Sequence, residues 1–151
     1  MRSNTLFLLV DDDTDDIVVF KEVLHDINSS IQLITAGDGL EALEMLRYRQ
    51  NGLPDIIFLD LNMPRMEGKE CLVEIKKDPQ LQHIPVIIYT TSSLSRDIED
   101  SMLKGAVCFI TKPASLKELK HIISSIAQSV HDDLERCLRT LSNTSTTFIV
   151  C

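Results

Sequence analysis

Five short, continuous apolar runs recur at regular intervals in this chain and constrain its fold more than any other feature. Runs that are apolar without alternation are typical of strands buried on both faces of a sheet. Between them, apolar residues recur every three or four positions, as at Phe20, Leu24 and Ile27, which is the spacing of an amphipathic helix. Strands that alternate with helices predict a parallel sheet with helices on both faces. The runs are Leu6–Val10, Ile31–Ala36, Ile56–Leu59, Val86–Tyr89 and Val107–Ile110.

The composition fits one globular domain and excludes several classes of function. The chain has 151 residues, of which 44% are hydrophobic and 25% charged. A formal net charge of -8 argues against direct binding of nucleic acid by charge. About 20 residues follow position 130, too few for a helix-turn-helix domain. The apolar stretch near the start is too short for a signal peptide or a membrane span, so we expect a cytoplasmic protein.

The four cysteines show no pattern of a metal site. Cys71, Cys108, Cys137 and Cys151 form no CxxC pair and lack zinc-ligand spacing with the histidines. We therefore expect thiols in a reducing compartment.

Polar residues follow four of the five apolar runs. Asp11, Asp12 and Asp13 come after the first run, Asp60 after the third, Thr90 after the fourth and Lys112 after the fifth. Each alone is explained equally well as a helix cap or a turn. Because the carboxyl ends of parallel strands meet at one edge of an open sheet, where ligands bind, the set together predicts a functional site.

Three carboxylates in one place require a counter-charge. Asp11, Asp12 and Asp60 would repel one another unless a cation neutralised them, and a small oxygen-lined site suits Mg²⁺. A carboxylate beside Mg²⁺ and Lys112 can attack phosphorus, while the Thr90 hydroxyl donates a hydrogen bond to a transferring oxygen. The expected product is an aspartyl phosphate.

In their order and spacing, these residues resemble the receiver domains of bacterial two-component signalling, over about Leu6 to Ile126. The resemblance implies an α/β, flavodoxin-like, doubly wound five-stranded parallel sheet of order 2-1-3-4-5 with five helices. We expect the receiver domain to span residues 1–130, followed by a C-terminal extension, 131–151, that is helical and then a tail.

The resemblance implies a role for each acidic residue of the site. Asp60 corresponds to the phosphoacceptor. Asp12 corresponds to a direct carboxylate ligand of Mg²⁺ and Asp11 to a ligand that acts through water. Asp60 itself and the backbone carbonyl of Asn62 complete the implied metal site.

The remaining site residues resemble the switch elements of the family. Thr90 corresponds to the switch hydroxyl, and Lys112 to the lysine that pairs with the phosphoryl group. Phe109 stands where the family keeps an aromatic that turns inward on activation. The peptide bond between Lys112 and Pro113 is expected to be cis.

The function implied is that of a single-domain response regulator in phosphorelay signal transduction. A sensor histidine kinase or a histidine phosphotransfer protein would donate the phosphoryl group, and an unknown downstream protein would read the result. Such a chain is no enzyme on other substrates, since it only assists its own phosphorylation and dephosphorylation. The segments Asp60-Leu-Asn-Met-Pro and Asp78-Pro-x-Leu-x-x-Ile-Pro-Val look most like single-domain regulators, including those paired with phytochrome-type kinases.

Three other readings of the acidic residues remain. A haloacid-dehalogenase-type phosphatase would use Asp11 as nucleophile and Asp13 as acid, but its further acidic pair is not evident. Asp11, Asp13, Asp15 and Glu22 have the spacing of a calcium-binding EF-hand loop, although Asp16 stands where that loop needs glycine. The third reading is a docking module that works without phosphorylation.

An apolar stripe in the last part of the chain extends beyond the length of the last helix of a receiver domain. An exposed stripe favours a homodimer through the C-terminal helix. The alternative is a turn at His131-Asp132, with a short helix capped by Asp132 and Glu135 folding back on the domain. The tail Thr147–Val150 is β-branched and apolar enough to add as an edge strand. The stripe consists of Leu116, Leu119, Ile123, Ile126, Val130, Leu134, Cys137 and Leu141.

Overall fold

The computed structural model describes residues 5–48 and 52–151, and its centre is a six-stranded sheet of order β2-β1-β3-β4-β5-β6. The first five strands are parallel, and β6 runs antiparallel to β5. The predicted order 2-1-3-4-5 is therefore confirmed, with one further strand at the β5 edge. The strands are β1 (Leu6–Val10), β2 (Gln32–Ala36), β3 (Ile56–Leu59), β4 (Val86–Thr90), β5 (Cys108–Thr111) and β6 (Ile149–Val150).

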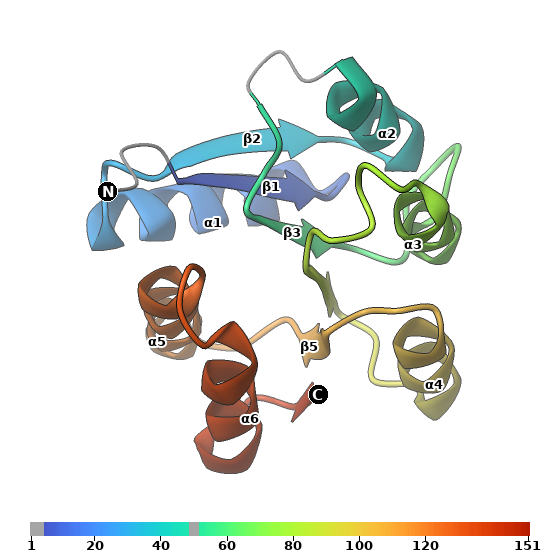
Figure 1. Ribbon diagram of the computed structural model, residues 1–151. Helices are drawn as coiled ribbons and strands as arrows, with labels where there is room; N and C mark the ends of the chain where they lie inside the picture. The colour runs from blue at the N-terminus through green and yellow to red at the C-terminus, as the bar shows by residue number, and fades with distance from the viewer. Residues whose placement is uncertain (1–4, 49–51) are drawn as a thin grey trace.

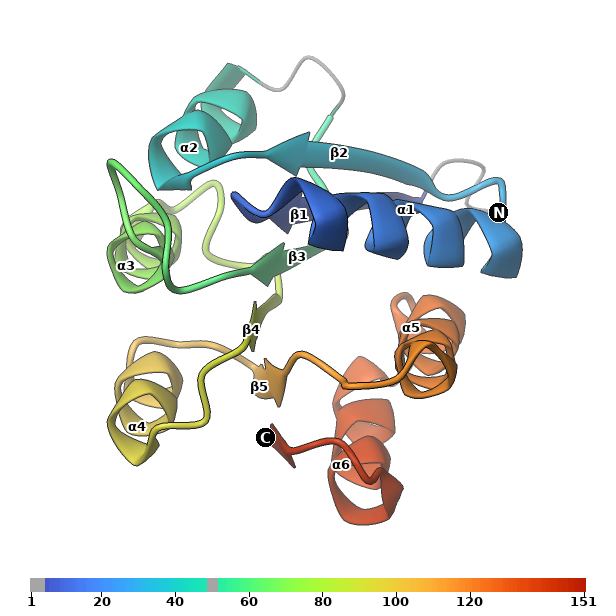
Figure 2. The same ribbon diagram turned by 180° about the vertical axis from the view of Figure 1, so that it is seen from behind.

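Helices cover both faces of the sheet, as the alternation of strands and helices predicts. Figure 1 shows α1, α5 and α6 on one side and α2, α3 and α4 on the other, and Figure 2 shows the same layers from behind. Among the described helices, none combines the length and apolar character needed to cross a bilayer. They are α1 (Thr14–Ile27), α2 (Gly39–Tyr48), α3 (Gly68–Lys77), α4 (Ser95–Leu103), α5 (Leu116–Ser129) and α6 (Leu134–Thr144).

The central strands are buried on both faces, which explains why their sequences do not alternate. In β5, the side chains of Cys108 and Ile110 join the core beneath α1 and α5, whereas Phe109 joins the core beneath α2, α3 and α4. Neighbouring residues of one strand thus enter opposite cores, and both cores require apolar side chains.

Side chains cap the N-termini of α1 and α5, whereas the cap predicted for α6 is wrong. Asp13 accepts hydrogen bonds from the first-turn amides of α1, and Ser115 accepts one from the Glu118 amide at the start of α5. The N-cap of α6 is Asp133 instead of the predicted Asp132, and its side chain makes no capping hydrogen bond. Asp133 has a left-handed backbone (φ 62°), which Asp tolerates better than most residues and which reverses the chain direction here.

Residues 131–151 fold back on the domain. After α5 the chain reverses, and α6 returns beside it (Figures 1 and 2), burying Leu138 and Leu141 in the core that α5 shares. The expectation of one straight helix with an exposed stripe is therefore wrong, and the fold-back alternative is correct. The homodimer prediction loses its support, because every residue of the stripe except the exposed Leu116 is buried or partly buried within the chain. The predicted edge strand is confirmed at Ile149–Val150.

The fold-back also corrects the expectation that all cysteines are thiols. Cys108 on β5 and Cys151 after β6 form a disulfide across 43 residues of sequence. The two residues come together because β6 pairs with β5, a contact that cysteine spacing alone does not reveal. Cys71 and Cys137 are free.

Candidate functional site

The acidic cluster forms where β1 and β3 end side by side. The Asp11 amide donates to the Ala36 carbonyl and the Asp60 amide donates to the Val10 carbonyl, both at 2.9 Å. These backbone bonds hold the two aspartates at adjacent strand ends. One carboxylate oxygen from each of Asp11, Asp12 and Asp60 lies within 4.8 Å of the others. The three carboxylates therefore lie close together, as the sequence predicted.

The three carboxylates differ sharply in environment. Asp11 is fully buried, Asp60 is 7% exposed and Asp12 is exposed. Burial raises the pKa of Asp11 to about 6, with a smaller contribution from the nearby Asp60 charge, against the lowering effects of Lys112 and the Asp13 amide. The buried Asp11 Oδ2 has no aligned hydrogen bond within the described parts of the chain. A divalent cation fits these residues, because it would supply the positive charge and the ligand that such oxygens need.

The side chain of Lys112 extends from the end of β5 into the acidic cluster. Its amide donates to the Thr90 carbonyl at 2.7 Å, which aligns the two strand ends. Its Nζ lies 2.7 Å from Asp11 Oδ2, 2.7 Å from Asp16 Oδ2 and 3.7 Å from Asp60 Oδ2. Burial favours a lower pKa for the Lys112 ammonium, but the carboxylates overcome this and raise the pKa above its ordinary value. The lysine therefore stays charged.

Asp16 was not among the predicted site residues, although it holds Lys112 as closely as Asp11 does. It lies in the first turn of α1, where Asp13 accepts a hydrogen bond from its amide. The only signal in the sequence is its place one helical turn after the acidic triplet. The first turn of a helix is also where the helix dipole favours any surface acid, so this signal is not specific. Its carboxylate competes with Asp60 for the lysine.

The Asp60 carboxylate is held by the loop that follows it, and the start of α3 packs against the backbone of that loop. Asp60 Oδ1 accepts a hydrogen bond from the Leu61 amide at 2.8 Å, which leaves Oδ2 toward Lys112. The Gly68 amide donates to the Leu61 carbonyl at 2.9 Å. A Cβ atom at Gly68 would lie 2.1 Å from the Asp60 carbonyl oxygen, so only glycine allows α3 to begin this close. Sequence analysis did not assign this role to Gly68.

Thr90 and Phe109 are both buried, and their switch roles stay predictions. The Thr90 hydroxyl is buried and, within the described residues, has no hydrogen-bond partner, so it is free to donate toward an oxygen at the site. Phe109 is fully buried and faces the core against which Ile98, Met102 and Val150 pack. Asn62 is exposed in the loop after Asp60, and its role as a carbonyl ligand stays a prediction.

The prediction of a cis bond between Lys112 and Pro113 is wrong. The described part of the chain contains no cis peptide bond. The trans form is the intrinsically favoured isomer before proline. Lys112 reaches Asp11, Asp16 and Asp60 from this trans arrangement.

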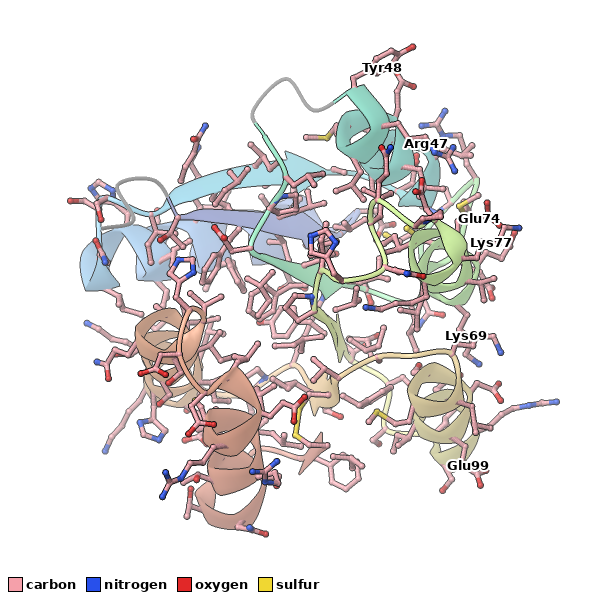
Figure 3. The ribbon with its side chains drawn as sticks, in the orientation of Figure 1. Arg47, Tyr48, Lys69, Glu74, Lys77 and Glu99 are labelled. Atoms are coloured by element: carbon pink, nitrogen blue, oxygen red, sulfur yellow. A yellow bond between two sulfur atoms is a disulfide. The ribbon has the colours of Figure 1, made fainter. Side chains whose placement is uncertain are left out.

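A second polar network holds the loop that follows Thr90. Lys69 on α3 pairs with Asp97 at 2.8 Å and with Asp100 at 3.0 Å, and these bonds raise the pKa of Lys69. The other Asp97 oxygen accepts from Ser92 Oγ at 2.6 Å. Figure 3 shows Lys69 between α3 and α4, with Glu99 on the far part of α4. In sequence, Asp97 and Asp100 look only like surface charges near a helix start, because their partner Lys69 lies on another helix.

Comparison with known proteins now decides the family. The model of the response regulator receiver domain matches residues 7–124. The chain belongs to the response regulator receiver family. The match lies inside the predicted domain of residues 1–130 and covers every residue of the acidic cluster.

Among the proteins that this receiver resembles are response regulators of phytochrome signalling. It is 37% identical over 125 residues to the response regulator Rcp1 of Synechocystis sp., covering 80% of this chain and 85% of that protein. Among solved structures, the phosphorylated cyanobacterial phytochrome response regulator RcpA superposes with a TM-score of 0.77 at 38% identity, covering 83% of this chain and 92% of that one. The Mn²⁺-bound form of Rcp1 gives 0.74 at 36% identity, covering 83% and 93%. The chain is accordingly a receiver of phosphorelay signal transduction.

Proposed function

We propose that Asp60 accepts the phosphoryl group. The observation that carries this proposal is the meeting of Asp11, Asp12 and Asp60 within 4.8 Å, with Lys112 3.7 Å from Asp60 Oδ2. Asp11 is a poorer nucleophile, because it is fully buried and paired with Lys112 at 2.7 Å. This difference disfavours the phosphatase reading, in which Asp11 would attack.

The cation of this site is Mg²⁺ in our proposal. Asp12 and Asp60 would ligate it directly, Asp11 would act through a water, and the Asn62 carbonyl would complete the protein ligands. Three direct oxygen donors, with a fourth acting through water, suit a hard ion that keeps several waters. When bound, the ion offsets the negative charge of the transferring oxygens. Rcp1 has been solved with Mn²⁺, which supports a divalent cation in a related regulator.

The transfer step uses residues already in place. An Asp60 carboxylate oxygen attacks the phosphorus of a phosphohistidine, an oxygen–phosphorus bond forms, and the phosphorus–nitrogen bond breaks. The electron pair leaves with the imidazole, which takes up a proton. Lys112 then pairs with the new phosphoryl oxygens and Thr90 donates its free hydroxyl hydrogen to one of them. Phe109 then moves together with Thr90. This movement alters the surface formed by α4, β5 and α5.

The partners follow from this chemistry. The donor is a sensor histidine kinase or a histidine phosphotransfer protein, and an unidentified downstream protein reads the altered face. Photoreceptor kinases of the phytochrome type are the donor class that the similarity to RcpA supports. The chain acts on no separate substrate and works in the cytoplasm. Its receiver domain comprises residues 1–130, and residues 131–151 are an extension packed on it.

Phosphorylation by a small donor tests the assignment. Wild type, Asp60→Asn and Asp15→Asn would be incubated with acetyl phosphate and Mg²⁺, and the acyl phosphate located by mass spectrometry. Asp15 is the matched control, because it is an exposed acid of the same region outside the cluster. We expect label on Asp60 in wild type and in Asp15→Asn, and none in Asp60→Asn. Label at the wild-type rate in Asp60→Asn would refute the proposal, and label on Asp11 would favour the phosphatase.

A further inference from the structure

The edge of β5 is covered by a later part of the same chain. Phe109 lies opposite Val150 and Ile110 opposite Ile149 in an antiparallel ladder. The Thr111 amide donates to the Phe148 carbonyl at 3.0 Å. The backbone groups of β5 that would otherwise be open to another strand are therefore occupied.

The residues before β6 are tied to α5 as well. The Ser145 hydroxyl bonds to the Glu118 carboxylate, and the Thr147 amide approaches Glu118 Oε1 at 3.4 Å. The Ser145 hydroxyl lowers the pKa of Glu118, so this carboxylate remains an acceptor. These polar contacts are few, and β6 has only two residues, of which Ile149 is buried and Val150 partly buried. A strand this short at the edge of the sheet opens more readily than the central strands.

A disulfide closes this cover. Cys108 is fully buried on β5, whereas Cys151 is exposed. A cavity of about 240 Å³ opens beside Cys151, lined also by Val107, Glu135, Leu138 and Arg139. Cys151 Sγ is therefore the sulfur that a small molecule in solution can reach, and the buried Cys108 becomes the leaving thiolate.

The two other cysteines are poor competitors for this chemistry. Burial raises the pKa of the Cys71 thiol to about 12, which keeps it protonated and unreactive. Cys137 is half-buried, and its sulfur bonds to the Ser125 carbonyl at 3.4 Å. Cys151 Sγ likewise lies 3.4 Å from the Leu138 carbonyl, so what distinguishes Cys108 and Cys151 is that the fold brings these two together and joins them.

We propose that Cys108 and Cys151 form a reversible thiol–disulfide site, addressed by small thiols and disulfides, whose redox state decides whether β6 covers β5. A disulfide in a reducing compartment is usually transient and acts as a sensor. The inference does not depend on phosphoryl transfer to Asp60, because it concerns a different pair of residues.

The chemistry requires only a small disulfide, such as oxidised glutathione, and its thiol. For closure, the Cys151 thiolate attacks one sulfur of the small disulfide and expels one small thiolate. The Cys108 thiolate then attacks Cys151 Sγ in the mixed disulfide and expels the second. Two protein thiols lose their protons and two electrons to become one disulfide, while one small disulfide becomes two thiols. Opening is the reverse, beginning at the exposed Cys151.

The position of the site links it to the signalling face. Phe109 follows Cys108 directly, and Val150 packs on the same core as Phe109. Thr111, whose amide donates to the carbonyl of Phe148 just before β6, is the residue before Lys112. Oxidation therefore closes the strand edge nearest the lysine, and reduction frees it for a partner strand. The receiver would then respond to redox state as well as to phosphorylation.

The test compares the full chain after incubation with oxidised glutathione and after incubation with excess dithiothreitol. Alkylation followed by mass spectrometry should show Cys108 joined to Cys151 in the first sample and all four thiols free in the second. Hydrogen exchange of the Thr111 amide should become at least about tenfold faster on reduction, as expected when a cross-link that restricts opening is lost. Exchange in β1 and β3 should not change.

Variants complete the test. Cys151→Ser should give the fast exchange at Thr111 in both conditions, with β1 and β3 unchanged, which shows that the domain remains folded. Cys137→Ser is the matched control and should respond as wild type does. The same comparison in Asp60→Asn separates the redox site from phosphorylation. Equal exchange at Thr111 in oxidised and reduced protein, or oxidation that joins Cys71 or Cys137 instead, would overturn the proposal.

Discussion

Asp11 should destabilise the folded protein at neutral pH when no metal is bound. Its carboxylate is fully buried, and burial raises its pKa from 3.8 to about 6. Between these two values the folded state holds a proton that the unfolded state has lost. Stability therefore falls as the pH rises from about 4 to about 6, and the loss is complete above about 7. The substitution Asp11→Asn removes the charge and should remove this loss.

The size of the effect follows from the same two values. The difference between 3.8 and about 6, at 1.36 kcal/mol per pH unit, is about 3 kcal/mol. The attraction of Lys112 is already contained in that pKa. The Asn variant should thus be more stable than wild type by up to about 3 kcal/mol at pH 8, and by almost nothing at pH 4. For a protein of this size, about 3 kcal/mol corresponds to roughly 6–12 °C in Tm.

The assay is thermal unfolding in EDTA between pH 4 and pH 8, with Asp15→Asn as the exposed control. The gap between Asp11→Asn and wild type should widen with pH, whereas Asp15→Asn should track wild type. Mg²⁺ at pH 8 should raise the Tm of wild type and narrow the gap, since a ligand of the folded state stabilises it. A gap that is independent of pH, or an Asn variant less stable than wild type at pH 8, would refute the reasoning.

Three further substitutions probe the neighbours of Asp60. Asp12→Ala should abolish both the Mg²⁺-dependent rise in Tm and phosphorylation, as measured by Mg²⁺ titration and acyl-phosphate mass spectrometry; a wild-type response to Mg²⁺ would contradict the cluster. Gly68→Ala places a Cβ 2.1 Å from the Asp60 carbonyl oxygen and should cost about 1–3 kcal/mol in urea unfolding. Asp16→Asn frees Lys112 from a partner at 2.7 Å and should speed phosphorylation by acetyl phosphate about two- to fivefold, a small factor because Asp16 is partly exposed; a slower rate would show that Asp16 assists the transfer.

The fold was predictable from the sequence because its signals are local. Strands buried on both faces require continuous apolar runs, and the runs ending at Val10, Leu59 and Tyr89 match β1, β3 and β4 to within one residue. The handedness of parallel crossovers leaves few arrangements for five such strands. The caps at Asp13 and Ser115 are local in the same sense, since each lies within a few residues of the amide that it satisfies.

The sequence predicted only those site residues that directly follow a strand. Asp11, Asp60 and Lys112 directly follow strands, so the topology alone brings them together. Asp16 and Lys69 project from helices, and their partners depend on how those helices pack. Lys69 meets Asp97 across two helices, a contact without any pattern in the sequence. Residues of this kind require the three-dimensional structure.

The last 21 residues show how one pattern supports two opposite structures. An apolar stripe on a helix must be buried against another surface. A second copy of the chain or another part of the same chain can provide that surface equally well. What decides between them is the reversal at residues 130–133, which depends on a left-handed Asp133 and not on any glycine or proline. Once the chain reverses, α6 covers α5, β6 reaches the free edge of β5, and Cys151 arrives opposite Cys108. A single residue in an uncommon backbone conformation thus determines whether the stripe is an interface or a core.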